Sequence, residues 1–299
     1  MITVFGSINI DQVYHMNAHP APGETTLGNG YAQVPGGKGA NQAVAARRAG
    51  AEVKMVGCVG ADTNADPALA LMRADKIETS DITKSELPTG CASIWVDGNG
   101  ENSIVVYSGA NTSVSADQVS DKQLGQSDYL LLQMEVPAEE NWKLLARAKD
   151  VKCKTVLNLA PIGDIPESAL RNLDYLIVNE LEAAALADQH QLDQTDEIEL
   201  ASILAKKFDL CCVLTLGGRG VVAVDGANII KLPALDVSVV DTTAAGDSFI
   251  GGFAAALSEG KSLEKSLQFA TVVAGLACTK LGAQSSIPYR DEVVAGFVT

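Results

Sequence analysis

Short apolar blocks alternate along this chain with longer segments in which apolar residues recur at helical spacing. The short blocks predict buried strands at Ile2–Ser7, Val53–Val59, Tyr129–Met134, Lys154–Leu159, Tyr175–Val178, Cys211–Leu216 and Val237–Val240. The longer segments predict helices at Ala40–Ala49, Ala65–Ala74, Ala138–Lys149, Glu180–Ala187, Glu197–Lys207, Gly246–Leu257, Leu263–Leu281 and Asp291–Val298. This alternation indicates an α/β fold, with a parallel sheet covered by helices on both faces.

One region departs from this alternation and predicts a small antiparallel element. Cys91–Val96 and Ser103–Tyr107 have strand character, and the Asp-Gly-Asn-Gly sequence that joins them is a strong hairpin-turn signal. Glu24–Val34 is also strand-like and is interrupted by glycine. We therefore expect residues 12–34 and 90–108 to supply the strands of a small lid over a cleft. An ordinary surface hairpin is the alternative.

Composition narrows the class of protein. The 299 residues are 47% hydrophobic and 20% charged, which fits one folded domain over residues 1–299. The net charge of −15 argues against nucleic acid or a membrane surface as a partner, because both require a basic face. The first residues lack the features of a secretory signal, and the apolar stretch Phe269–Cys278 is shorter than the ~18 residues of a membrane span. With six cysteines and no C-x-x-C pair, we expect a cytoplasmic protein.

Several familiar catalytic motifs are missing from the sequence. It has no G-x-x-x-x-G-K-[ST] phosphate loop and no G-x-G-x-x-G after the first predicted strand. A Ser-His-Asp hydrolase is disfavoured because the chain has only three histidines. Two of them, His15 and His19, are followed closely by prolines, which disfavours a helical metal site.

The segment Pro35–Ala43 carries three glycines that lead directly into a predicted helix. Glycine allows the backbone to approach a ligand closely and to adopt positive φ angles. The side chains of Lys38 and Asn41 would then present donors to hydroxyl groups or to an anion. A glycine-rich helix entry with a surface lysine is the alternative interpretation.

The segment Asp241–Phe249 opens a second helix rich in glycine and alanine. The successive N–H groups of Ala244, Ala245 and Gly246 would point out of its N-terminus and form a nest for developing negative charge. Asp247, in the first turn, is placed to accept a proton from a hydroxyl group that attacks a phosphoryl group in the nest. A role of Asp247 as a helix cap alone is the alternative.

These two segments together resemble the motifs of the ribokinase family of sugar kinases, in sequence and in chain order. Further segments that resemble the family are Gly6–Asp11, Gln133–Glu135, Asn179–Glu182, Thr215–Gly220 and Gly282–Gln284. The resemblance therefore covers essentially the whole chain.

The resemblance implies a three-layer α/β/α sandwich with a mainly parallel central sheet and a small β-sheet lid, which in the family often forms a dimer interface. It implies that Asp247 is the general base that deprotonates the primary hydroxyl of a sugar. Ala244, Ala245 and Gly246 would form the anion hole. The family usually has glycine where Ala244 stands, a change that leaves the backbone donors in place.

The resemblance also implies binding roles. The positions that match sugar contacts are Asn9, Asp11, Gly37, Lys38, Gly39, Asn41, Glu135 and Asp247. Those that match nucleotide contacts are Asn179, Thr215, Gly217, Gly218, Arg219, Gly220, Gly246 and, where the family often has a histidine, Thr271. Glu182 would act near Mg²⁺ through water. A monovalent-cation site that suits potassium matches Asp241, Thr243, Ala277, Lys280, Gly282 and Ser286.

The resemblance thus predicts an ATP-dependent kinase that converts D-ribose to ribose 5-phosphate and forms a homodimer through its lid. A kinase of the same family that acts on deoxyribose, another pentose or a ketohexose is the close alternative. Nucleoside kinases are disfavoured because aromatic residues make up only 5% of the chain. Sugar-phosphate kinases are disfavoured because we identify no extra basic residues for the sugar pocket. A non-catalytic sugar sensor is disfavoured because Asp247 and Glu182 are both present.

Overall fold

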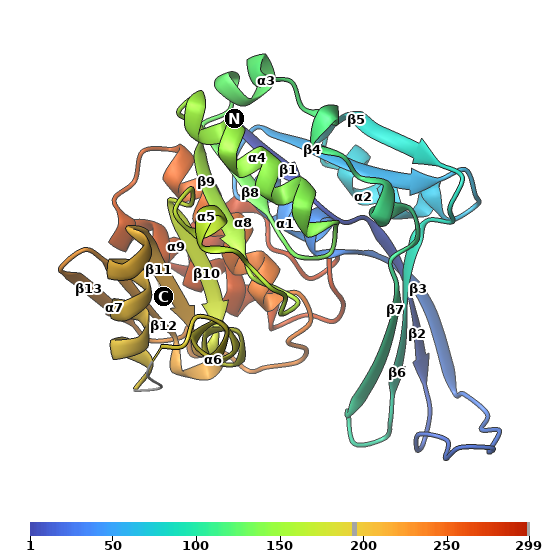
Figure 1. Cartoon of the computed structure of the whole chain (residues 1–299). Coiled ribbons are helices and arrows are strands. Elements are labelled where there is room, and N and C mark those ends of the chain that lie inside the picture. Colours follow the sequence, from blue (N-terminus) through green and yellow to red (C-terminus); the bar gives the residue numbers. More distant parts are fainter. Residues whose placement is uncertain (193–195, 298–299) are drawn as a thin grey trace.

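A nine-stranded sheet forms the body of the molecule in a computed structural model that describes residues 1–192 and 196–297 (Figure 1). In sheet order its strands are β13 (Asn228–Leu232), β12 (Val221–Asp225), β11 (Cys211–Thr215), β10 (Tyr175–Asn179), β9 (Lys154–Asn158), β8 (Tyr129–Leu132), β1 (Ile2–Phe5), β4 (Val53–Gly60) and β5 (Glu78–Ser85). The strands from β11 to β5 are parallel, and β12 and β13 are added antiparallel at one edge. Ligands bind at the carboxyl edge of such a sheet.

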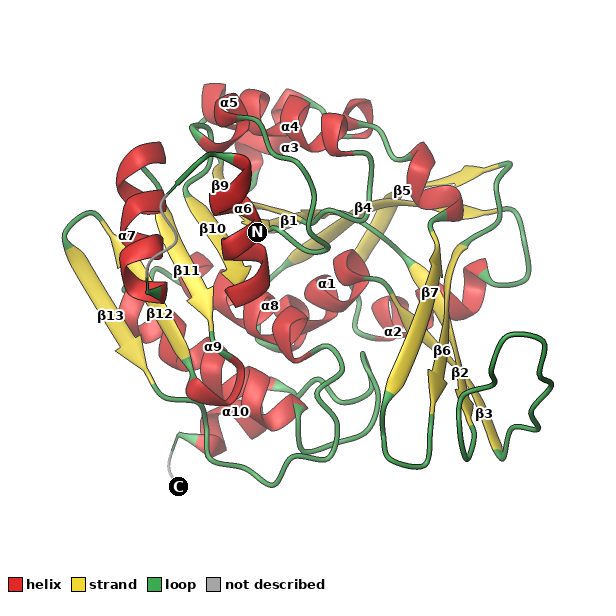
Figure 2. Ribbon diagram, turned by 60° about the horizontal axis from the view of Figure 1, so that its bottom comes forward, coloured by secondary structure: helices red, strands yellow, loops and turns green. Residues whose placement is uncertain are grey.

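Helices cover both faces of this sheet (Figure 2). One layer comprises α1 (Lys38–Arg48), α2 (Ala65–Ala74), α8 (Ala245–Ser258), α9 (Leu263–Ala277) and α10 (Arg290–Gly296). The other comprises α3 (Asp121–Gln126), α4 (Ala138–Asp150), α5 (Glu167–Leu170), α6 (Glu180–Gln189) and α7 (Glu197–Phe208). Successive strand residues face opposite layers, so Val4 packs with the first and Phe5 with the second. The predicted three-layer architecture with a mainly parallel sheet is confirmed.

A separate four-stranded sheet projects from this body (Figure 1). Its strands, in sheet order, are β3 (Gly30–Gly36), β2 (Asn9–His15), β6 (Gly90–Val96) and β7 (Asn102–Tyr107). The hairpin of β6 and β7 is confirmed, with antiparallel pairing from Cys91 opposite Tyr107 to Val96 opposite Asn102. The strand expected at Glu24–Val34 begins only at Gly30, and β2 lies only in part within the range 12–34 expected to supply lid strands.

The apolar block Val237–Val240 is not a strand, so that prediction is wrong. Val239 and Val240 are exposed, and the backbone N–H of Val240 donates to the carbonyl oxygen of Cys278 at 2.8 Å. Strand β5 escapes the prediction because polar residues occupy its exposed positions. Strand β13 also escapes it, and its exposed positions hold Asn228, Ile229 and Lys231. Strand β12 is a short apolar block that the pattern should have revealed.

The C-terminal helices differ from the prediction at their ends. The helix expected at Leu263–Leu281 ends at Ala277, and the chain then forms a loop that contains Gly282 at a φ of 93°. The helix expected at Asp291–Val298 begins one residue earlier, and Val298 lies outside the described residues. Among the residues that the structure describes, no helix combines the length and the apolar character needed to cross a bilayer.

Candidate active site

The N-terminal parts of α1 and α8 lie side by side, and two side-chain amides of α1 hydrogen-bond one carboxylate of α8. Asn41 donates from Nδ2 to Oδ2 of Asp247 at 2.9 Å, and Gln42 donates from Nε2 to Oδ1 at 3.0 Å. Asp247 is only 7% exposed. Both oxygens of this buried carboxylate therefore have a donor that holds them in one orientation.

Close packing of the two helices makes this contact possible. Gly251 lies one turn after Asp247, on the same face of α8. A Cβ atom at Gly251 would lie 2.4 Å from Cβ of Ala45 and 2.6 Å from the carbonyl oxygen of Gln42. Only glycine allows α1 and α8 to approach this closely.

Gln42 connects Asp247 to a chain of buried amides. Its Nε2 also lies 3.2 Å from Oδ1 of Asn158, and its Oε1 accepts a hydrogen bond of 2.8 Å from Nε2 of Gln133. Gln42 and Gln133 are fully buried. Gln42 is missing from the sequence-based site, although its place beside Asn41 in the glycine-rich segment is a signal that points to it.

The residues expected to contact a sugar gather around the first turn of α1. Oε2 of Glu135 accepts hydrogen bonds from Oγ of Ser7 at 2.5 Å and from the backbone N–H of Lys38 at 2.9 Å. Oδ1 of Asn9 accepts a hydrogen bond of 2.7 Å from Nδ2 of Asn111. Asn111 carries no sequence signal, because this contact joins segments that are far apart in the chain.

Glycines allow the backbone to pass close to these groups. Gly37 precedes α1 with a φ of 87°, a left-handed conformation that other residues rarely adopt. A Cβ atom at Gly39 would lie 2.6 Å from the backbone nitrogen of Ser7. The predicted role of these glycines as a close backbone approach is thus consistent with their geometry.

Electrostatic interactions couple the charged residues of this site. Burial, together with the charges of Glu135 and Asp247, raises the pKa of Asp11 to about 7. The charge of Asp247 raises the pKa of Lys38, with smaller contributions from Glu135 and Glu182, although burial lowers it. Oδ1 of Asp11 and Oδ1 of Asn41 are buried and have no hydrogen-bond partner among the described residues. The site therefore offers buried acceptors to the hydroxyl groups of a ligand.

The N-terminus of α8 borders a cavity of about 260 Å³, whose lining includes Lys38, Glu182, Ala244, Ala245, Gly246 and Asp247. Ala244 precedes the helix in a left-handed conformation, with a φ of 58°. The N–H of Ala245 donates to the carbonyl oxygen of Thr242 at 3.1 Å. The residues of the predicted nest therefore line the same cavity as the predicted base, Asp247. One of the three N–H groups of the nest, that of Ala245, is already hydrogen-bonded within a turn.

Most residues expected to contact a nucleotide line an adjacent cavity of about 270 Å³. They are Thr215, Gly217, Gly218, Gly220, Gly246 and Thr271. Apolar side chains complete the lining, among them Leu235, Val237, Val239 and Phe249. The block mistaken for a strand thus lines this cavity, which suits a flat apolar group such as a purine.

Two predicted nucleotide contacts lie elsewhere. The guanidinium group of Arg219 is exposed and pairs with Oε1 of Glu180 at 2.5 Å and with Oε1 of Glu197 at 2.6 Å. Asn179 lines the cavity beside Asp247 and caps α6. Its Oδ1 accepts from the N–H of Glu182, and its own N–H donates to Oε2 of Glu182, both at 2.8 Å. Burial raises the pKa of Glu182, against the opposing effects of this N–H and of Lys38.

The residues expected to bind a monovalent cation lie around Asp241. Oδ1 of Asp241 accepts from the hydroxyl of Thr243 at 2.6 Å, and Oδ2 accepts from the N–H of Gly282 at 2.9 Å. Partial burial would raise the pKa of Asp241, but these hydrogen bonds lower it overall. The second bond ties the approach to α8 to the loop after α9, which carries Lys280 and Ser286. The described residues contain no group of three or more His, Cys, Asp or Glu side chains that could hold a metal ion.

Comparison with known proteins gives matches over the whole chain. A model of the pfkB family of carbohydrate kinases matches residues 1–290. The ribokinase of Haemophilus influenzae is 40% identical over 98% of this chain and 97% of its own length. The structure of Thermotoga maritima ribokinase has a TM-score of 0.92 and 37% identity, and covers 100% of this chain and 99% of its own. Arabidopsis thaliana ribokinase, solved with ribose and ATP, has a TM-score of 0.90 and 29% identity, with coverage of 100% and 98%.

Proposed function

Because the chain belongs to the pfkB family of carbohydrate kinases, we propose that it transfers the terminal phosphoryl group of ATP to the 5-hydroxyl of D-ribose. The observation that carries this proposal is the buried carboxylate of Asp247 beside a helix N-terminus, in a cavity that Lys38 also lines. The products are ribose 5-phosphate and ADP.

In the proposed reaction Asp247 is the general base. It takes the proton of the 5-hydroxyl while the sugar oxygen bonds to the γ-phosphorus and the bond from phosphorus to the oxygen of ADP breaks. Asn41 and Gln42 keep the carboxylate in one orientation through their hydrogen bonds. The N–H groups of Ala244, Ala245 and Gly246 are the proposed anion hole, in which positive partial charge at the start of α8 stabilises the transferring group.

The sugar is proposed to bind between β2 and the first turn of α1. Its hydroxyl groups would satisfy Oδ1 of Asp11 and Oδ1 of Asn41, which are buried without partners among the described residues. Asn9, Gly37, Lys38, Gly39 and Glu135 would complete the pocket. A site built from such groups rejects a sugar that leaves one of them unpaired.

The adenosine part of ATP is proposed to occupy the apolar cavity lined by Thr271, Phe249 and the glycines of Thr215–Gly220. Asn179 would contact the phosphates from the neighbouring cavity, which it lines. Arg219 would reach the nucleotide only after leaving its two glutamate partners. We therefore rank Arg219 below the other proposed nucleotide contacts.

Two cations, Mg²⁺ and potassium, are proposed to assist the phosphoryl transfer. Glu182 would act near Mg²⁺ through water, since magnesium keeps several waters, and the ion would neutralise charge on the phosphates of ATP. Potassium would bind to oxygen atoms of Asp241, Thr243, Ala277, Lys280, Gly282 and Ser286. The donor set suits it, because hydrogen bonds keep the pKa of Asp241 low and hold this carboxylate against the loop at Gly282. The ion would favour one conformation of the chain that leads into the anion hole.

The projecting sheet is proposed to act as a lid and as the interface of a homodimer. Every residue of β7 is exposed. Val105 lies on the same face of the sheet as Tyr31 of β3, whereas Ile104 and Val106 lie on the opposite face, which also carries Asp11. Exposed apolar residues of this kind are typical of an interaction site. Sedimentation of the wild type and of Val105→Lys tests this, since the variant should be monomeric. We also propose a cytoplasmic location, which suits six free cysteines.

The proposed activity is tested by ADP release with Mg²⁺, ATP, potassium and a panel of sugars. Ribose should give the highest kcat/KM, ahead of 2-deoxyribose, other pentoses and fructose. A preference for another sugar would support the proposed kinase activity and identify a different substrate. Stabilisation by ribose without any ADP release would instead support a sugar sensor.

A further inference from the structure

Arg48, in the last turn of α1, has a buried guanidinium group whose partners all lie outside this helix. Its Nε donates to Oδ2 of Asp75 at 2.7 Å, and its side chain is only 4% exposed. Its Nη1 donates to the carbonyl oxygens of Gln284 and Ile287, at 2.7 and 2.9 Å. One buried cation therefore joins the end of α2 to the loop after α9.

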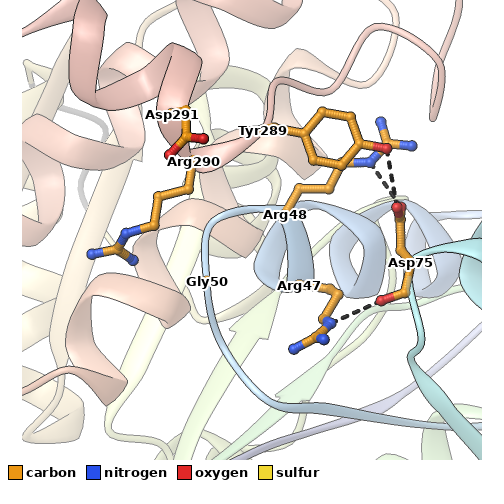
Figure 3. Close-up of a pocket in the computed structure, with 7 residues that line it drawn as sticks. All are labelled: Arg47, Arg48, Gly50, Asp75, Tyr289, Arg290 and Asp291. Carbon is orange, nitrogen blue, oxygen red and sulfur yellow. Dashed lines mark hydrogen bonds and ion pairs between the residues drawn. The ribbon is translucent and has the colours of Figure 1, made fainter.

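Asp75 and Tyr289 hold this guanidinium in place (Figure 3). The ring of Tyr289 lies over it, with Cζ of Arg48 4.6 Å from the ring centroid. The hydroxyl of Tyr289 donates to Oδ1 of Asp75 at 3.1 Å. The two oxygens of Asp75 thus bind Arg48 and Tyr289 respectively, and the arginine has little freedom to turn away from the loop.

The loop that Arg48 binds is the one that carries the proposed potassium ligands. Gln284 and Ile287 lie on either side of Ser286, and Lys280 and Gly282 precede them. The loop is attached at Gly282 to Asp241 and at Gln284 and Ile287 to Arg48. Backbone carbonyl groups bind a cation well only if the chain already holds them in position.

We propose that Arg48 is a positioning residue for the monovalent-cation site, which it preorganises by fixing the loop at Gln284 and Ile287. This inference rests on the proposed function, which supplies the cation site. Loss of the guanidinium hydrogen bonds to Gln284 and Ile287 should weaken potassium binding and leave turnover at saturating potassium nearly unchanged. Lysine in place of Arg48 keeps a charge for Asp75 but lacks the planar fork that reaches the two carbonyl groups as well.

The test compares Arg48→Lys with Arg47→Lys. Arg47 is the neighbouring arginine, and it donates to the carbonyl oxygens of Asp75 and Ala51, not to the loop. Two quantities are measured at constant ionic strength, with choline chloride as the balancing salt. They are the potassium concentration for half-maximal ADP release and the rise in melting temperature that potassium causes. We expect a rise of about tenfold in the half-maximal concentration for Arg48→Lys, as for other groups that orient metal ligands, and no change for Arg47→Lys.

Tyr289→Phe removes only the hydroxyl bond to Asp75 and serves as a milder second variant. It should shift the half-maximal potassium concentration in the same direction by a smaller factor. Unchanged potassium dependence in Arg48→Lys and Tyr289→Phe would overturn the inference and leave the kinase proposal intact. A loss of turnover that saturating potassium does not restore would also overturn it. If potassium affects neither quantity in the wild type, the proposed cation site is wrong and so is this inference. The kinase proposal would still be tested by ribose-dependent ADP release.

Discussion

Gln42 donates a hydrogen bond of 3.0 Å to Oδ1 of Asp247, although 205 positions separate the two residues in the chain. Oε1 of the same amide accepts a hydrogen bond of 2.8 Å from Nε2 of Gln133. The orientation of the proposed base is therefore set by a buried amide chain that begins at Gln133, directly after β8. In an enzyme that moves a proton from a hydroxyl group, a small displacement of the base is costly.

Substitution of Gln42 should slow catalysis. Gln42→Glu removes the Nε2–H donor to Oδ1 of Asp247 and places a second carboxyl group beside it, so like charges repel and the base loses its fixed orientation. We expect kcat for ADP release to fall by roughly 10–100-fold. Gln189→Glu is the control, because Gln189, the last residue of α6, hydrogen-bonds the backbone of Ile165. An unchanged kcat for Gln42→Glu would contradict this role.

Substitution of Asp11 should change stability with pH. Burial and neighbouring charges raise its pKa to about 7, so ionised Asp11 disfavours the folded state. The stability that this group contributes is fully present below its unfolded pKa of 3.8 and is lost as pH rises through about 7. Asp11→Asn should therefore raise the free energy of unfolding by roughly 2–4 kcal/mol at pH 8, and by almost nothing at pH 4.

Urea unfolding of the ligand-free protein at these two pH values measures the effect of Asp11→Asn. Asp150→Asn, at the exposed end of α4, is the control because it removes a solvated charge. A gain that is equal at both pH values would show that charge burial is not its cause. The KM for ribose should rise in Asp11→Asn, because the amide no longer provides two acceptors.

Ala244 should tolerate glycine better than any larger residue. Its φ of 58° disfavours residues with a Cβ atom, and most strongly the β-branched ones. Ala244→Gly should leave kcat nearly unchanged and alter stability by no more than about 1 kcal/mol, because relief of strain offsets the added freedom of the unfolded chain. Ala244→Val should be clearly destabilised and slow. Thermal melting and ADP release measure both effects, and equal behaviour of the two variants would refute the left-handed assignment.

Gly251→Ala should push α1 away from α8. The added methyl group would overlap the backbone of α1 at Gln42, at a cost of about 1–3 kcal/mol in unfolding free energy. Activity should fall as well, because Asn41 and Gln42 would lose their positions on Asp247. Gly125→Ala, in the exposed helix α3, is the control and should be neutral or stabilising by about 1 kcal/mol. Equal effects of the two substitutions would contradict the close approach of α1 and α8.

The parts of the site that lie in local motifs are predictable from the sequence. Asp247 and the start of α8 belong to one motif, and Lys38 and Asn41 belong to another. That these two motifs meet is implied by a family resemblance, not by spacing. The contacts of Asn111 with Asn9 and of Arg48 with Gln284 are not predictable, because tertiary packing alone brings these residues together.

Errors in the fold have a similar origin. Val237–Val240 has the apolar pattern of a strand, yet part of it lines the apolar cavity proposed for adenosine. Strand β5 lies at the edge of the sheet, where exposed positions accept polar residues, so its pattern is weak. A short apolar block can line a ligand pocket as well as the interior of a sheet, so the hydrophobic pattern alone does not distinguish the two.

The most direct test of Asp247 as the general base is the kcat of Asp247→Asn at saturating ribose, ATP, Mg²⁺ and potassium. The amide keeps the shape of the side chain but cannot accept the hydroxyl proton. We predict a fall of roughly 10²–10⁴-fold in kcat. Ribose should still raise the melting temperature, which shows that the sugar site remains. A kcat within about tenfold of the wild type would contradict the assignment of Asp247 as the base.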